Sequence, residues 1–182
     1  MISGDKNYNG VIDDLVNGSW ISPSDNKKYG IPIKNIEIRE TLDGREYDLI
    51  ESLHSNQKLL VVSDPFTHKA MGSRIFNNLK TKMNAEEYIW EQPSSSIEGV
   101  QFLRTKLKDY DGMIAVGSGT VSDSIKYATF LEDKVYSVFA TTPMNAYTTG
   151  TASISFDGIK KSLVAHYAQG VFFDLEVLSN CP

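Results

Sequence analysis

Three short apolar runs constrain the fold of this chain most, because each is too hydrophobic to have a face in water. The runs are Leu59–Ser63 (LLVVS), Met113–Val116 (MIAV) and Val135–Ala140 (VYSVFA). Unbroken apolar runs of this length suit strands that are covered on both faces, as in a parallel sheet. Residues at helical spacing follow the first run, namely Met71, Ile75 and Leu79. The pattern predicts strands that alternate with helices.

The segments between these runs extend the pattern. We expect two further strands, one over Asn35–Glu40, where apolar and polar residues alternate, and one over Glu87–Trp90. Ser95 and Glu98 have the spacing of a capping box and precede apolar residues at helical spacing, which are Ile97, Val100, Leu103 and Leu107. A further helix is expected over Val121–Leu131. The predicted fold is therefore an α/β fold with a doubly wound, mostly parallel sheet and helices on both faces.

The two ends of the chain differ from this pattern. Length favours a single domain over residues 1–182, since domains commonly have about 100–200 residues. Residues 1–34 are rich in turn residues around one apolar stretch, Val11–Val16, and we expect an irregular N-terminal extension there. After Pro143 the chain becomes rich in Thr, Ser and Gly, and residues 152–156 alternate. This segment predicts a loop and hairpin beside the sheet.

Composition excludes several classes of protein. The chain has 18 basic and 23 acidic residues and a net charge of −5, so it does not attract nucleic acid or anionic lipid. No apolar run approaches the about 20 residues that cross a bilayer, and the first ten residues do not resemble a signal peptide. The single cysteine, Cys181, cannot form an internal disulfide. We expect a cytoplasmic protein that acts on a small molecule; the sequence does not exclude a homo-oligomer.

The most informative motif is the turn Gly117-Ser118-Gly119-Thr120, which joins a predicted buried strand to a predicted helix. Glycines let the backbone approach an anion closely, and the free N–H groups of a helix N-terminus favour negative charge. The hydroxyls of Ser118 and Thr120 could add donors to a phosphate. The alternative is a simple tight turn in which Thr120 and Asp123 form a capping box. Both interpretations stay open, because glycine-rich turns are weak signals when alone.

Asp64 ends the first apolar strand and precedes a proline. In an open α/β sheet the carboxyl ends of the strands line the ligand crevice, where a carboxylate can accept hydrogen bonds from a ribose and repel a 2′-phosphate. An aspartate before a helix is also a good N-cap, so this second interpretation is equally natural. In a parallel sheet Asp64 and the glycine turn would share one edge, as a dinucleotide requires.

The sequence contains no recognisable catalytic or metal motif. His54, His68 and His166 share no spacing that is typical of metal ligands, and no nucleophile elbow or zinc-protease motif occurs. We assign no catalytic residue and no metal ligand.

Four segments in order carry a family resemblance: the GSGT turn, ATTPMNAYTTG, ISFDGIKKSLVAH and GVFFDLEVLSNCP. Together they resemble the N-terminal, cofactor-binding half of sn-glycerol-1-phosphate dehydrogenases, in the superfamily of iron-containing alcohol dehydrogenases and dehydroquinate synthases. The resemblance covers residues 59–182. It implies a Rossmann-like domain that binds NAD or NADP, followed by a helical domain that holds a divalent metal, usually zinc.

The resemblance also implies roles for particular residues. Gly117, Ser118, Gly119 and Thr120 match its pyrophosphate loop, and Asp64 matches its ribose-binding acid, which favours NAD over NADP. The family contacts the cofactor at three further positions, Thr141, Thr142 and Thr149. Asn145 takes the place of a substrate-binding aspartate in many members, and Lys160 and Lys161 match a segment near the substrate.

The metal ligands of the family lie beyond residue 182. The resemblance therefore implies a domain of a metal-dependent dehydrogenase for glycerol phosphate, dihydroxyacetone phosphate or a related polyol, in which this part alone is inactive. Two alternatives stay open. One is a non-catalytic nucleotide-binding module, and the other is a lyase domain related to dehydroquinate synthase.

Overall fold

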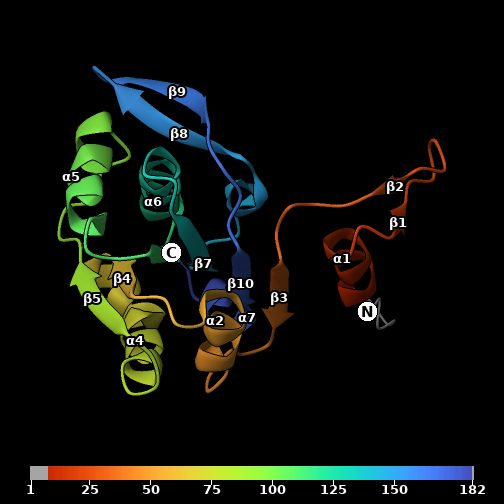
Figure 1. The fold of residues 1–182 in the computed structure, drawn as a ribbon, viewed down its shortest axis with the longest axis horizontal. Coiled ribbons are helices and arrows are strands. Elements are labelled where there is room, and N and C mark those ends of the chain that lie inside the picture. Colours follow the sequence, from red (N-terminus) through yellow and green to blue (C-terminus); the bar gives the residue numbers. More distant parts are fainter. Residues whose placement is uncertain (1–7, 182) are drawn as a thin grey trace.

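The structure is a computed structural model that describes residues 8–181. Its centre is a sheet of six parallel strands in the order β3-β10-β7-β6-β4-β5 (Figure 1). The strands are β3 (Asn35–Arg39), β4 (Leu59–Ser63), β5 (Ala85–Ile89), β6 (Gly112–Gly117), β7 (Val135–Ala140) and β10 (Gly170–Asp174). The predicted parallel α/β fold is confirmed.

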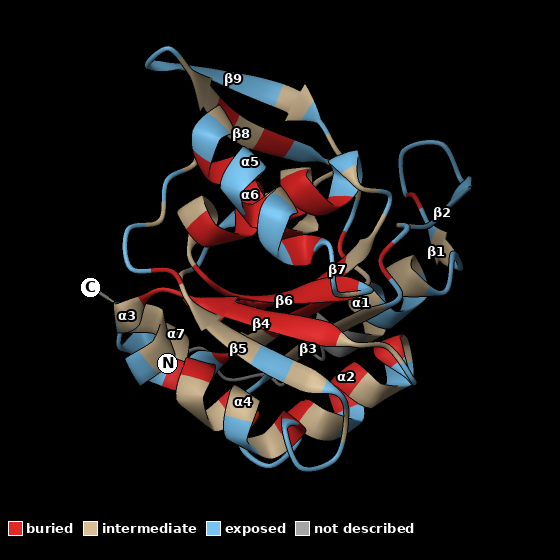
Figure 2. Cartoon of the chain, turned by 60° about the vertical axis from the view of Figure 1, so that its left-hand side comes forward, coloured by how far each residue is buried: buried red, intermediate tan, exposed pale blue. Residues whose placement is uncertain are grey.

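Helices cover both faces of this sheet, as expected for strands that are apolar on both sides (Figure 2). The helices α5 (Ile97–Leu107) and α6 (Gly119–Leu131) lie on one face, where they pack on Leu60 and Val62 of β4. On the other face, α2 (Glu46–His54) and α4 (Ser73–Leu79) pack on Leu59 and Val61. All of β4 and β6 is buried between the two layers.

The path of the chain creates a switch point between β4 and β6. From β4 the chain runs through α3 (Pro65–Thr67), a π-helical turn (His68–Gly72) and α4 to the edge strand β5. It then returns across the opposite face through α5 to reach β6 on the other side of β4. The connections leave β4 and β6 toward different faces, so a crevice opens at the carboxyl ends of these two strands. Ligands of open α/β sheets bind at such a point.

The predicted hairpin near the C-terminus is also confirmed. Strands β8 (Thr151–Phe156) and β9 (Ile159–Val164) pair antiparallel, and β8 packs against α6. The two turn residues, Asp157 and Gly158, both have positive φ, 50° and 81°. An Asp-Gly pair in this conformation matches the right-handed twist of the strands, and this match explains the tight connection.

Two local predictions were wrong, and two elements were not predicted. The expected irregular extension contains α1 (Tyr8–Val16) and a small ribbon of β1 (Trp20–Ile21) and β2 (Lys28–Tyr29); residues 1–7 of it lie outside the described residues. The cap of α5 is Ser96, which accepts a hydrogen bond from the Gly99 N–H, and not the Ser95–Glu98 box. A strand was not expected at β10, nor a helix at α2.

Within residues 8–181, no helix combines the length and the hydrophobicity needed to span a membrane.

Candidate functional site

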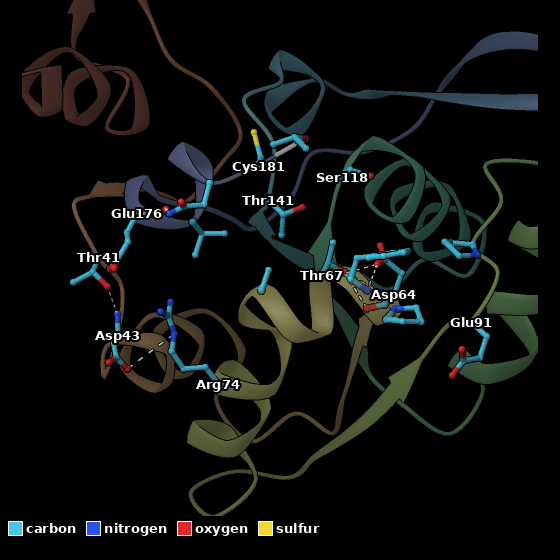
Figure 3. Close-up of a pocket in the computed structure, with 17 residues that line it drawn as sticks. Thr41, Asp43, Asp64, Thr67, Arg74, Glu91, Ser118, Thr141, Glu176 and Cys181 are labelled. Carbon is cyan, nitrogen blue, oxygen red and sulfur yellow. Dashed lines mark hydrogen bonds and ion pairs between the residues drawn. The ribbon is translucent and has the colours of Figure 1, made fainter.

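A cleft of about 850 Å³ lies along the carboxyl edge of the sheet. Residues that follow β3, β4, β5, β6, β7 and β10 line it, so the cleft crosses the switch point and extends to both sides of it (Figure 3). Asp64 and Ser118 from the predicted site both face this cleft, as do Thr141 and Thr142. Residues from three separate segments of the sequence are thereby brought to one edge.

The N-terminus of α6, with the positive end of the helix dipole, lies at this edge. Ser118 is the N-cap residue, and its side chain makes no capping hydrogen bond within the described structure. Since the Ser118 carbonyl first accepts from the Ser122 N–H, the amides of residues 119–121 have no partner within the helix. A 13-residue helix thus presents free N–H groups and its dipole at the switch point, as an anion site requires.

The two positions of the turn are glycine for different structural reasons. A Cβ at Gly117 would lie 2.7 Å from the Val121 Cβ, so this glycine lets the first turn of α6 pack directly on β6. A Cβ at Gly119 would lie 2.8 Å from Cε of Met144, the mobile end of a flexible side chain. Gly117 is therefore required for packing, whereas a side chain at Gly119 would have to displace the end of Met144.

The alternative capping box between Thr120 and Asp123 does not form. The Asp123 carboxylate instead accepts a hydrogen bond from the Ser153 N–H at 3.1 Å and lies 3.5 Å from Nζ of Lys126. Lys126 is 0% exposed and also donates to the carbonyls of Ala146, at 2.7 Å, and Thr151, at 2.9 Å. Burial lowers the pKa of Lys126, and the charge of Asp123 opposes this shift.

This ion pair joins α6 to the 141–151 segment. Sequence reasoning missed it, although a charged pair three residues apart in an otherwise uncharged helix was the available signal.

The segment after β7 is tied to the glycine turn by a tyrosine. The Tyr147 hydroxyl donates to the Gly117 carbonyl at 2.9 Å and lies 2.9 Å from the Thr142 hydroxyl. Thr141 is different, because its buried hydroxyl has no hydrogen-bond partner among the described residues although it lines the cleft. A buried hydroxyl without a partner is costly, which suggests that a ligand supplies one.

Asp64 has the capping role that was one of its two interpretations. Its Oδ1 accepts hydrogen bonds from the Phe66 N–H at 2.8 Å and the Thr67 N–H at 2.9 Å, and the Thr67 hydroxyl accepts from the Asp64 N–H. Its other oxygen, Oδ2, makes no hydrogen bond within residues 8–181 and belongs to a residue that lines the cleft. The cap therefore leaves one oxygen for the predicted contact with a ribose.

The charged side chains around the cleft are mostly acidic: Asp43, Asp64, Glu91 and Glu176. In the described part of the chain, Arg74 is the only basic side chain that lines it. Arg74 is already paired with two carboxylates that are fully buried, Glu46 at 2.7 Å and Asp174 at 2.6 Å.

Burial acts to raise the pKa of Asp174, but hydrogen bonds from the Leu42 N–H and from Arg74 outweigh it and hold the pKa below its usual value. The charge of Arg74 is thus neutralised by carboxylates of the protein itself. An anion in the cleft would therefore depend on the helix amides for its binding.

Ser118 is the one residue of the predicted turn that lines the cleft; Gly117, Gly119 and Thr120 do not line it, and neither do the remaining predicted residues. Thr149 donates its hydroxyl hydrogen bond to the Ala146 carbonyl, and Asn145 is exposed at the start of a short 3-10 turn, Asn145–Thr148. Lys160 and Lys161 are exposed on β9, in the outer hairpin. Their predicted contacts with cofactor or substrate stay predictions.

The histidines have local partners. His54 is buried between Ser137 and Gln57, at 2.7 and 2.8 Å, and His68 pairs with Glu87 at 3.1 Å.

The fold and the cleft define a doubly wound α/β domain with a cleft and an open helix N-terminus at its switch point. The sequence pattern of the family described as iron-containing alcohol dehydrogenase matches residues 37–182. The chain belongs to this family.

Sequence relatives agree with this membership, and solved structures share the fold. The chain is 28% identical over 137 residues to a glycerol-1-phosphate dehydrogenase [NAD(P)+] of Bacillus subtilis, covering 70% of this chain and 34% of that protein. It is 27% identical to the protein of the same name from Geobacillus thermodenitrificans, covering 69% and 33%. The chain therefore spans about a third of these relatives.

The crystal structure of a glycerol dehydrogenase from Schizosaccharomyces pombe matches with a TM-score of 0.72 and 19% identity, over 82% of this chain and 39% of that one. A maleylacetate reductase from Agrobacterium tumefaciens matches with a TM-score of 0.69 and 17% identity, over 84% and 44%.

The metal that the family name implies finds no ligand set in this part. Within residues 8–181, no three His, Cys, Asp or Glu side chains are grouped so that they could hold a metal ion.

Proposed function

We propose that this chain is the NAD(P)-binding domain of a dehydrogenase that acts on glycerol phosphate, dihydroxyacetone phosphate or a related polyol. The observation that carries the proposal is the open N-terminus of α6 at the switch point, beside the unpartnered hydroxyl of Thr141. The names of the two curated relatives support the substrate class.

The residues present fit a dinucleotide. The free amides of residues 119–121 would bind its linked phosphates, with the hydroxyls of Ser118 and Thr141 as added donors. Oδ2 of Asp64 would accept a hydrogen bond from a ribose hydroxyl of the adenosine half. The nicotinamide, when bound, supplies the group that accepts or releases a hydride.

Binding of NADH to the full chain tests this proposal, with nicotinamide fluorescence as the readout. We expect saturable binding, and we expect Gly119→Asp to abolish it, because the new carboxylate would place negative charge at the anion site. A matched control is Thr105→Asp, which adds the same charge on the exposed side of α5. Absence of a saturable response up to millimolar NADH would overturn the proposal, as would equal binding by both variants.

The acidic cleft further favours NAD over NADP. The 2′-phosphate of NADP would be placed beside Asp64 and near Glu91, with Arg74 already neutralised. Asp64→Asn retains a good N-cap but removes the charge, so it should raise NADP affinity relative to NAD by about tenfold, the equivalent of one lost like-charge contact of 1–2 kcal/mol. Glu91→Gln is the companion variant, because it removes the other negative charge near the expected 2′-phosphate. An unchanged ratio of the two dissociation constants in Asp64→Asn would contradict the assignment of NAD preference to the charge of Asp64.

The substrate is tested on the whole protein. We expect NAD(P)-dependent oxidation of glycerol 1-phosphate or reduction of dihydroxyacetone phosphate, lowered by Asn145→Ala and by Lys160→Ala if these residues contact the substrate. Turnover of a dehydroquinate synthase substrate in the same assay would favour the lyase alternative. Binding of NADH with neither activity would favour a non-catalytic module.

A further inference from the structure

Phe66 has the most exposed large apolar side chain in the described structure, with 86% of its surface accessible. Single apolar residues on a surface are common and need no explanation by themselves. Phe66 differs because it lines the cleft, one residue from the proline that begins α3. Phe66 therefore belongs to the wall of the proposed ligand site and not to a distant part of the surface.

The backbone beneath the ring is held firmly. The Phe66 N–H donates to Oδ1 of Asp64 at 2.8 Å, and Pro65 fixes φ at the first helical position. The next residue, Thr67, donates its N–H to the same oxygen and its hydroxyl to the Val116 carbonyl on β6, at 2.9 Å. An exposed aromatic ring on a fixed backbone loses little conformational freedom when a flat group stacks on it.

The position of Phe66 along the cleft indicates which part of a ligand it meets. From β6 to the edge strand β5, the lining runs from Ser118, the N-cap of α6, to residues after β4 and β5, which are acidic at Asp64 and Glu91 and apolar at Pro65, Phe66 and Pro93. Neighbouring strands are about 4.8 Å apart, so the apolar residues of this wall begin about one strand from the proposed anion site. Toward β7 and β10 the lining instead carries polar side chains, among them Thr141, Glu176 and Asn180.

We propose that Phe66 is the platform on which the adenine base of the dinucleotide stacks. The inference rests on the proposed function and adds to it the residue that holds the base. The base would lie beyond the ribose that Asp64 contacts, against the apolar side chains Phe66 and Pro93. Stacking on an aromatic ring needs no hydrogen bond to the base edge, so this contact would tolerate other purines.

Calorimetric titration of the full chain with two half-ligands tests the proposal. ADP-ribose carries the adenine half, and nicotinamide mononucleotide carries the other half. Loss of one base–aromatic stack corresponds to about a five- to tenfold weaker dissociation constant at a partly exposed site. We expect this loss for ADP-ribose in Phe66→Ala, with unchanged binding of nicotinamide mononucleotide, and we expect Phe66→Trp to bind as the wild type does.

Two controls separate stacking from other effects. Phe66→Leu retains much of the apolar area without the aromatic face, and it should resemble Phe66→Ala. Phe130→Ala removes a partly exposed ring of α6 that does not line the cleft, and it should not change ADP-ribose binding. Because the Phe66 ring is almost fully exposed, the melting temperature of Phe66→Ala should equal that of the wild type.

The outcomes distinguish the two proposals. Equal ADP-ribose affinity of the wild type and Phe66→Ala would overturn the stacking role and leave the cofactor proposal intact. Equal losses for both half-ligands would also overturn it, since they would indicate a general disturbance of the cleft. If the wild type bound neither ADP-ribose nor NADH, both proposals would fail.

Discussion

Thr141 shows how one side chain can separate a binding role from a structural one. Its hydroxyl is buried and has no partner among the described residues, so Thr141→Val removes no hydrogen bond of the protein. We expect urea denaturation to give the same or a slightly higher free energy of unfolding, and NADH titration to give about a tenfold larger dissociation constant, as for a lost hydrogen bond to a charged group.

The matched control is Ser63→Ala. Ser63 has an equally buried hydroxyl without a described partner, but it does not line the cleft, so NADH binding should not change. Weaker binding in this control, or a large loss of stability in Thr141→Val, would contradict the assignment.

Single residues of the site could be predicted where their strand was predicted. Asp64 and Ser118 follow buried apolar runs directly, so the carboxyl edge of a parallel sheet was their expected place. Arg74 could not be placed in this way. Its partners, Glu46 and Asp174, come from a helix and a strand that are far away in the sequence, and only the packed fold brings the three together.

At the scale of elements, the buried pair of Asp123 and Lys126 holds α6 against the segment that follows β7. Lys126→Met would leave Asp123 buried without its cation and two backbone carbonyls without a donor. Breaking a buried pair from one side costs about 3–5 kcal/mol, and we expect a loss of this size in urea denaturation.

The double variant Asp123→Asn with Lys126→Met should recover part of that loss, because it leaves no unpaired charge. If Lys126→Met lowered the free energy of unfolding by less than about 1 kcal/mol, the pair would not be what holds α6 against this segment.

The elements themselves could be predicted only where the apolar pattern was strong. The bounds of β4 and β7 agree with the apolar runs residue by residue, because both strands are buried on both faces. The strand β10 was missed because only a five-residue helix, α7 (Leu175–Ser179), follows it, so the usual strand–helix alternation is absent. The helix α1 was missed because asparagine and glycine residues lie within and around it. Adjacent serines made the cap of α5 ambiguous by one position.

The whole molecule should lose stability as the pH falls below neutrality, because two of its histidines are held neutral. Burial lowers the pKa of His54, and hydrogen bonding to Gln57 opposes this; burial and the charge of Lys126 lower the pKa of His166. Below the unfolded pKa of about 6.5, the unfolded chain therefore binds protons that the folded chain excludes.

The contribution of these neutral histidines to the free energy of unfolding is thus fully present above about pH 6.5, and it decreases as the pH falls. Each histidine can contribute at most about 1.4 kcal/mol per pH unit in this range. Urea denaturation at pH 7.5 and pH 5.5 measures the decrease. His54 joins α2 to β7 through the Ser137 hydroxyl, which also accepts the Gly170 N–H of β10. His54→Gln should therefore be less stable at pH 7.5 yet show a smaller decrease at pH 5.5. An equal decrease in this variant would mean that other groups cause the acid sensitivity.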